Sequence, residues 1–164
     1  MTTTQTTRRI HRAIASGAAV AVTLAGSAAL GGDAHAATRT PYQQLPAPSK
    51  QVVRMVNQER IAHSRAKLRV KEDLTLVAQR WTQKMADSGT LAHNPRLTKQ
   101  VKGWRYVGEN VGYGPDNPTV QAAFMQSPGH RANILDRDYS QIGVGTVLQG
   151  DRIWVTQVFR RPAR

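Results

Sequence analysis

The 164-residue sequence contains no cysteine, so no disulfide can hold the fold together and stability must come from packing alone. Aromatic side chains are scarce, at 5% of the residues, and few of them lie between basic residues. A surface that stacks on nucleic-acid bases is therefore not expected. Acids are also few, with 10 Asp and Glu against 23 Lys and Arg, and the formal net charge is +13. This charge favours anionic partners, such as envelope polyanions or acidic lipids, although a merely solvated basic face has the same composition.

Only one long apolar run is present, from Ala13 to Leu30. Three arginines precede it and Ala34-His35-Ala36 follows it, which is the pattern of a secretory signal peptide with its cleavage site. We therefore expect residues 1–36 to be a signal peptide and the mature protein to be secreted and extracellular, by an export route that the sequence leaves open. No later run is long enough to span a membrane, so we expect no transmembrane segment in the mature chain.

The remaining chain is expected to form one domain at residues 49–164, after a flexible, proline-containing lead-in at residues 37–48. Apolar residues at helical spacing predict three helices. They run from Ser49 to about His63, from about Glu72 to Ser88 with Trp81 on the core face, and from Pro118 to Gln126.

The C-terminal half also predicts strands. Trp104 to Val107 is a short strand candidate, followed by a glycine-rich segment at residues 108–114 that contains Glu109. Three glycines in seven residues predict a backbone that either turns tightly or approaches another group closely. Two β-rich runs, at residues 142–148 and 153–159, flank a short turn and predict an antiparallel hairpin. The expected fold class is α+β, with helices on both faces of a small antiparallel sheet.

The stretch Ser127-Pro128-Gly129-His130 carries a helix-start signal. We expect the Ser127 hydroxyl to cap a short helix and His130 to lie in its first turn. The positive helix end there disfavours a cationic imidazole, and a neutral His130 can bind a metal or accept a proton. It can equally form only a hydrogen bond within the turn. Without a G-x-S-x-G elbow or an oriented acid, Ser127 is not expected to be a hydrolase nucleophile.

Five short motifs, taken together and in order, resemble the bacterial branch of the CAP superfamily, the group of cysteine-rich secretory proteins, venom antigens and plant pathogenesis-related proteins. The resemblance covers about residues 49 to 160 and implies a three-layer α-β-α sandwich with a cleft. The motifs are His93-Asn94-Pro95, Gly108-Glu109-Asn110-Val111, Ser127-Pro128-Gly129-His130-Arg131-Ala132-Asn133-Ile134-Leu135, Ile142-Gly143-Val144-Gly145 and Trp154-Val155-Thr156-Gln157-Val158-Phe159.

In many members of that superfamily two histidines and two acids converge in the cleft and can hold a divalent ion, often zinc. The resemblance implies His93 and His130 as the metal-ligand candidates and Glu109 as the first acid and candidate catalytic residue. Ser127 stands where the second acid is expected, so the site departs from the full pattern. Asp136 or Asp138 is a candidate for the missing carboxylate. Two imidazoles and one carboxylate suit Zn²⁺ with an open, water-filled position.

Two functions stay open at this point. The first is an extracellular binding module for a metal, a lipid or an anionic envelope ligand. The alternative is a metal-assisted hydrolase of peptide or cell-envelope substrates, in which Glu109 activates a bound water. A third interpretation gives His93, Glu109 and His130 only a structural role, as a buried hydrogen-bonded triad that holds three loops together. We expect a monomer and no specific nucleic-acid partner.

Overall fold

The computed structural model describes residues 41–164. The predicted signal peptide and residues 37–40 of the lead-in lie outside the described residues. The helices are α1 (Pro41–Gln44), α2 (Ala47–Ala62), α3 (Glu72–Ser88), α4 (Leu97–Gln100), α5 (Asn117–Gln126) and α6 (Pro128–Leu135). The strands are β1 (Arg69–Val70), β2 (Trp104–Gly114), β3 (Gln141–Gln149) and β4 (Arg152–Pro162).

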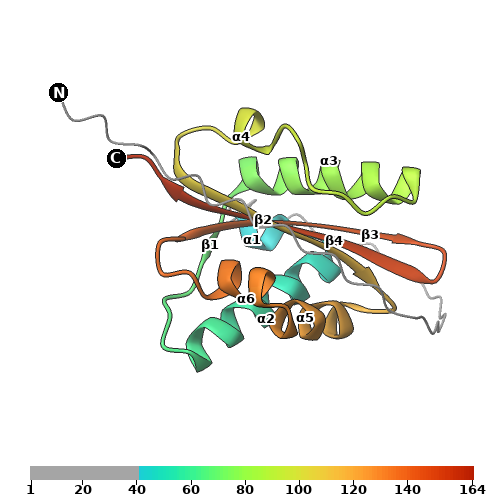
Figure 1. Ribbon diagram of the computed structural model, residues 1–164, viewed down its shortest axis with the longest axis horizontal. Coiled ribbons are helices and arrows are strands. Elements are labelled where there is room, and N and C mark those ends of the chain that lie inside the picture. The colour runs from blue at the N-terminus through green and yellow to red at the C-terminus, as the bar shows by residue number, and fades with distance from the viewer. Residues whose placement is uncertain (1–40) are drawn as a thin grey trace, which may run out of the picture.

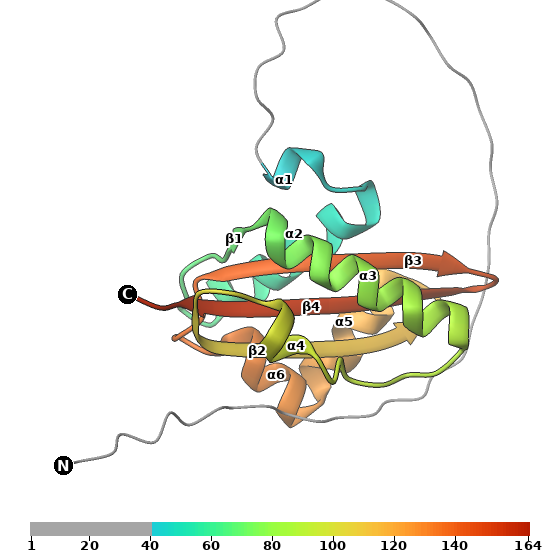
Figure 2. The same cartoon turned by 90° about the horizontal axis from the view of Figure 1, so that it is seen from above.

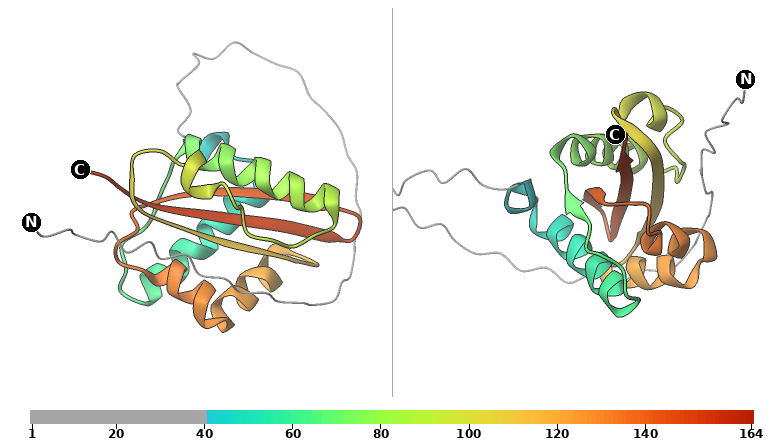
Figure 3. Two further views of the ribbon diagram at one scale, coloured as in Figure 1. Left: turned by 45° about the horizontal axis from the view of Figure 1, so that its top comes forward. Right: turned by 90° about the vertical axis from the view of Figure 1, so that its left-hand side faces the viewer.

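The elements form three layers around one four-stranded sheet of order β1-β3-β4-β2. Figure 1 shows α3 and α4 on one face of the sheet and α2, α5 and α6 on the other. The end-on view in Figure 3 shows the same two helical layers, with the sheet between them. The expected α-β-α sandwich is therefore confirmed, and none of the helices in residues 41–164 is both long and apolar enough to cross a membrane.

The sheet differs from the expected one in one respect. The hairpin of β3 and β4 is antiparallel, as predicted, and β2 pairs antiparallel with β4. However, β1 pairs parallel with β3, through Arg69 opposite Gln141 and Val70 opposite Ile142. A two-residue strand leaves no alternation to detect, and its partner lies about half the chain away, so local sequence did not indicate it.

The glycine-rich segment is part of β2, so the tight turn is wrong and the alternative prediction, a close approach, is confirmed. Its pairing with β4 continues from Tyr106 to Gly114, although three glycines fall in this stretch. A Cβ at Gly112 would lie 2.8 Å from the ring of Phe124 on α5. The glycines therefore let the helical layer approach the strand closely, which is a second reason for glycine besides turning.

The lead-in is also more ordered than predicted from residue 41 onward. It contains α1 and the start of α2, and Leu45 between them is buried in the larger core cluster. Farther along α2, the buried guanidinium of Arg60 donates to the carbonyls of Ile134 at 2.7 Å and Asp136 at 2.9 Å. Burial lowers the pKa of Arg60, and the carbonyl bonds hold the turn after α6 in place.

Candidate functional site

Glu109 lies on β2, the strand at one edge of the sheet, and its side chain faces α3. Side chains alternate along a strand, and the flanking Val107 and Val111 both pack in core clusters that include α3 residues. The side chain of Glu109 is only 4% exposed. Burying a carboxylate is costly unless it accepts hydrogen bonds, so its partners define the site.

Those partners come from the segment between α3 and α4, which runs alongside the outer edge of β2 (Figure 2). Nδ1 of His93 lies 2.9 Å from Oε1 of Glu109, and the main-chain N–H of Asn94 donates to the same oxygen at 2.9 Å. An ionised carboxylate only accepts, so His93 carries its proton on Nδ1 in this pair. Two of the predicted site residues, His93 and Glu109, are thus in direct contact.

The Asn94-Pro95 turn is built by further bonds of Asn94. Its side-chain oxygen accepts from the main-chain N–H of Arg96 at 3.0 Å, and its side-chain nitrogen donates to Gln100 at 2.7 Å. Asn94 is therefore buried between Glu109 and α4, and it fixes the path of the loop that carries His93. In the sequence, the Asn94-Pro95 pair indicates only a turn, and no local pattern indicates this bridging role of Asn94.

His130 lies in the first turn of α6, as predicted, on the side of β2 that faces α5 and α6. It is 1% exposed, and its ring packs on Phe124 with 4.7 Å between ring centroids. Its main-chain oxygen accepts from the side chain of Asn110 at 3.1 Å, and Asn110 is the strand neighbour of Glu109. Asn133, one turn later on α6, donates to the main-chain oxygen of Glu109 at 3.2 Å. The helix that carries His130 is thus hydrogen-bonded to Asn110 and to the main chain of Glu109, while the Glu109 side chain contacts His93 on the other face of β2.

Ser127 stands at the N-cap of α6, but its hydroxyl forms no capping bond, which corrects the sequence prediction. Its main-chain oxygen accepts the first helical bond, from Arg131 at 2.9 Å.

Asp136 and Asp138, the candidates for the missing second carboxylate of the site, form other contacts. Asp138 pairs with Arg161, and Asp136 accepts from the main-chain N–H of Asp138 at 2.8 Å.

The side chains around Glu109 do not provide the full set of ligands that zinc requires. Catalytic zinc sites in proteins use three side-chain ligands and one open position. Within residues 41–164, no group of three or more His, Asp or Glu side chains is placed to hold a metal ion. Nε2 of His93 and Oε2 of Glu109 are buried and have no hydrogen-bond partner among the described residues. The site as assembled offers donor atoms, but it does not fit a resident zinc ion on the described side chains alone.

A cationic cleft of about 400 Å³ opens directly beside the pair. Its walls are α3 and the turn that follows His93, and its lining residues are Arg80, Trp81, Lys84, Asn94, Pro95, Arg96 and Gln100. Trp81 packs against a core cluster, as predicted, and its half-buried ring also lines this cleft. Its indole N–H donates to the Ala92 carbonyl at 2.9 Å. The Lys84 ammonium lies 5.3 Å from the centre of that ring.

The three cations of the cleft were not distinguishable from other basic residues in the sequence. Arg80 and Lys84 are one helical turn apart on α3, and Arg96 joins them only because Glu109 and Asn94 fix the loop. None of the described lining residues is acidic. A cleft with three cations and one aromatic wall is suited to a ligand that carries phosphate or carboxylate groups.

Comparison with known proteins agrees with this architecture. Residues 53–159 match the model of the cysteine-rich secretory protein family, known as CAP. The chain belongs to this family. The CAP superfamily resemblance of the sequence motifs is therefore confirmed, in a member that has no cysteine at all.

Two relatives from bacteria share the domain. The uncharacterised protein YkwD of Bacillus subtilis is 33% identical over 129 residues, which are 73% of this chain and 50% of YkwD. An extracellular protein of Bacillus anthracis with an SCP domain has a TM-score of 0.63 and 26% identity, over 73% of this chain and 42% of its own. The chain thus spans half or less of the length of these two relatives.

One structural neighbour has been solved with a metal. The protein NaASP2, crystallised with Zn²⁺, matches with a TM-score of 0.56 and 12% identity, over 71% of this chain and 81% of its own. At that identity the likeness concerns the fold alone. It does not assign a metal to this chain.

The carboxylate of Glu109 should hold the loop at residues 90–96 against β2. We predict that Glu109→Ala frees the Asn94 amide, whose protection against hydrogen exchange falls on the order of tenfold, as the loss of about 1 to 3 kcal/mol of hydrogen bonding implies. Glu109→Gln keeps an acceptor oxygen at Oε1 and should retain most of this protection. Hydrogen exchange followed by mass spectrometry measures both variants, and equal protection of this loop in wild type and Glu109→Ala would contradict the assignment.

Proposed function

We propose that the protein is an extracellular binding module whose cationic cleft takes an anionic ligand of the cell envelope. The observation that carries the proposal is the gathering of Arg80, Lys84 and Arg96 around Trp81, directly beside the His93–Glu109 pair. The predicted signal peptide and the extracellular Bacillus anthracis neighbour support a location outside the cell. The net charge of +13 would draw polyanions toward the whole surface, and the cleft would select among them.

In this proposal each side chain has a distinct part. The guanidinium groups of Arg80 and Arg96 would pair with phosphate or carboxylate oxygens in a forked geometry. Lys84 would add a point charge next to the Trp81 ring, and the ring would cover an apolar face of the ligand. Glu109 would not touch the ligand, because its role is to hold Asn94 and so the Arg96 side of the cleft.

A charge-matched comparison tests this function. Replacing Arg80, Lys84 and Arg96 with Gln should weaken binding of a purified wall teichoic acid roughly tenfold, if each exposed contact contributes about 0.5 kcal/mol. Replacing three exposed cations elsewhere, Lys102, Arg105 and Arg137, with Gln changes the net charge equally and should have a much smaller effect. Binding is measured by calorimetry at two ionic strengths. Equal losses in both triple variants would mean that net charge and not the cleft binds the polymer, as would affinity that does not change with salt in any variant.

A metal-assisted hydrolase is the second candidate. It is favoured by the orientation of His93, whose Nδ1 is held by Glu109 while Nε2 is left without a partner among the described residues. A carboxylate that orients a histidine in this way is common beside metal ions. The sequence prediction gives His93 and His130 the role of metal ligands and Glu109 that of catalytic carboxylate, but the described side chains alone do not assemble a site for the ion.

Metal analysis of the purified protein distinguishes this second candidate from a structural pair. Stoichiometric zinc that is lost in both His93→Ala and His130→Ala would support a metal site. If metal content is unaffected and both substitutions lower the melting temperature, these histidines serve the fold. Arg137→Ala, at an exposed position on the turn between α6 and β3, is the control for nonspecific effects on either measurement.

A further inference from the structure

A smaller hollow of about 190 Å³ adjoins the cationic cleft, toward the C-terminal end of α3. This Thr90 hollow is lined by Trp81, Lys84, Met85, Ser88, Thr90 and Ala92. Trp81 and Lys84 also line the cleft, so the two hollows share these side chains as a wall. The hollows therefore follow one another along α3, between that helix and the segment beside it (Figure 2).

A ligand that occupies both hollows has to pass over Trp81 and Lys84. The half-buried Trp81 ring is held by the bond of its indole N–H to the Ala92 carbonyl, and the exposed Lys84 ammonium lies 5.3 Å from the ring centre. The α3 residues that line the two hollows run from Arg80 to Ser88, which is about 12 Å along the helix axis at 1.5 Å per residue. A single phosphate group covers only part of this length, so a ligand that fills both hollows is a chain.

The Thr90 hollow offers hydroxyl oxygens rather than a cluster of cations. The Ser88 hydroxyl donates to the Met85 carbonyl at 3.3 Å, and the Thr90 hydroxyl donates to the Ser88 carbonyl at 3.2 Å. A hydroxyl oxygen that donates its proton still accepts hydrogen bonds. Both side chains are exposed, and among the described residues that line the hollow Lys84 is the one cation and none is acidic. This lining suits a neutral unit whose own hydroxyl groups donate, such as a polyol.

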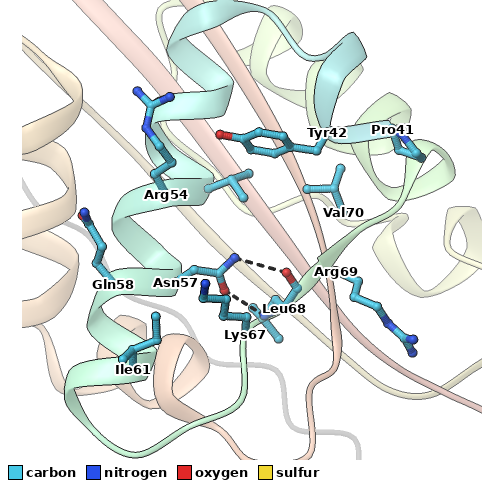
Figure 4. A pocket seen from close by; sticks show the side chains of 11 residues that line it. Pro41, Tyr42, Arg54, Asn57, Gln58, Ile61, Lys67, Leu68, Arg69 and Val70 are labelled. Atoms are coloured by element: carbon cyan, nitrogen blue, oxygen red, sulfur yellow. Dashed lines mark hydrogen bonds between the residues drawn. The ribbon is translucent and has the colours of Figure 1, made fainter. Parts of the chain in front are cut away.

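A different hollow, at the opposite edge of the sheet, has cations without such hydroxyl groups. This α2–β1 groove of about 660 Å³ has an apolar floor that includes Val53 and Leu68 (Figure 4). Its Asn57 amide is bonded to the N–H and the carbonyl of Leu68, at 2.7 and 3.2 Å. Three exposed cations line it, Arg54, Lys67 and Arg69, and its described lining includes no serine or threonine. The α2–β1 groove is therefore a control, within the same molecule, for binding by charge alone.

We propose that the Thr90 hollow is a second subsite of the cleft, and that the two together bind a chain in which phosphate and polyol units alternate. A phosphate lies at the three cations of the cleft, and a polyol unit lies against Ser88 and Thr90. Lys84, which lines both hollows, contacts the phosphate that links the two units. This inference rests on the proposed function, since it takes the cleft to be the phosphate site, and it adds the class and the minimum length of the ligand.

The second subsite is tested by filling it. Thr90→Phe places a ring in the hollow without changing the net charge, and it should weaken binding of a glycerol phosphate tetramer roughly fivefold, as the loss of about one hydrogen bond implies. Inorganic phosphate, which occupies the cleft alone, should bind both proteins equally. Thr119→Phe, at an exposed threonine on α5 in the other helical layer, is the matched control and should bind the tetramer like wild type. Binding is followed by NMR titration at constant ionic strength.

A second variant leaves the hollow open. Ser88→Ala with Thr90→Val removes both hydroxyl oxygens and little volume, and it should weaken the tetramer at least twofold. Linear inorganic tetraphosphate, which has phosphates but no polyol, should bind this double variant like wild type. An equal loss for the two ligands would mean that the hollow takes phosphate, and it would overturn the polyol assignment.

Charge alone is tested at the α2–β1 groove. Replacing its three cations with Gln removes as much charge as replacing the three cations of the cleft, and it should change the tetramer affinity much less. In wild type the tetramer should also shift the main-chain amide signal of Thr90, which inorganic phosphate should leave unmoved. A tetramer that binds without moving this signal would overturn the second subsite.

The outcomes separate this inference from the proposed function. The tetramer can bind wild type and lose affinity in the triple variant of the cleft, yet bind Thr90→Phe and the Ser88 and Thr90 double variant as tightly as wild type. The second subsite is then wrong and the cleft proposal stands. Equal losses in the triple variants of the cleft and of the α2–β1 groove would instead contradict the cleft proposal, and this inference with it.

Discussion

A buried carboxylate on an edge strand is the constraint on which the site depends. Glu109 is almost fully removed from solvent, and without hydrogen bonds this burial would cost several kcal/mol. The segment after α3 supplies the bonds, through His93 and the main chain of Asn94. Because this segment also carries Pro95 and Arg96, the same bonds shape one wall of the cationic cleft. Glu109 therefore organises a cationic cleft that its own side chain does not line.

On the other face of β2, amide side chains form a hydrogen-bonded network. Asn110 donates to Gln157 on β4 at 3.0 Å as well as to the His130 carbonyl, and Asn133 donates to the Asn110 oxygen at 2.9 Å. Amide side chains satisfy one another here without any net charge, so α6 is held in a fixed position at low electrostatic cost. The resulting geometry places His130 beside Phe124 and on the far side of the strand from the His93–Glu109 contact. The two faces of β2 thus carry different polar groups, a carboxylate on the side of α3 and amides on the side of α6.

The helices and strands that are marked by a pattern within a short stretch of sequence were predicted correctly. The periodicity of α3, the proline at the start of α6 and the hairpin of β3 and β4 were all readable from short windows. The length of β2 was not, because glycines such as Gly108, Gly112 and Gly114 fit a tight turn as well as a close approach, and only the packed structure shows that they allow a close approach. Similarly, β1 depends on a partner about half the chain away.

The candidate site was likewise predicted only in part. His93 and Glu109 were identified from motifs, and their contact is present. The cleft was not identified, because Arg80, Lys84 and Arg96 look like scattered surface charges until α3 and the loop are packed together. The sequence signal for the cleft was the position of Trp81 next to two cations on one helix. The same spacing places Trp81 with the apolar residues that face the core, so the signal was ambiguous. Likewise, Asn57 of α2 and Leu68 meet only once the chain has turned back from α2 toward β1.

The central claim is that an anionic ligand is bound in the cleft rather than over the basic surface in general. Two-dimensional NMR of the protein, titrated with a short glycerol phosphate oligomer, tests this most directly. The account predicts that the Trp81 indole and the Asn94 amide shift first and saturate together, since both lie at the cleft. Shifts spread evenly over the exposed lysines and arginines, with these two signals unmoved, would contradict it.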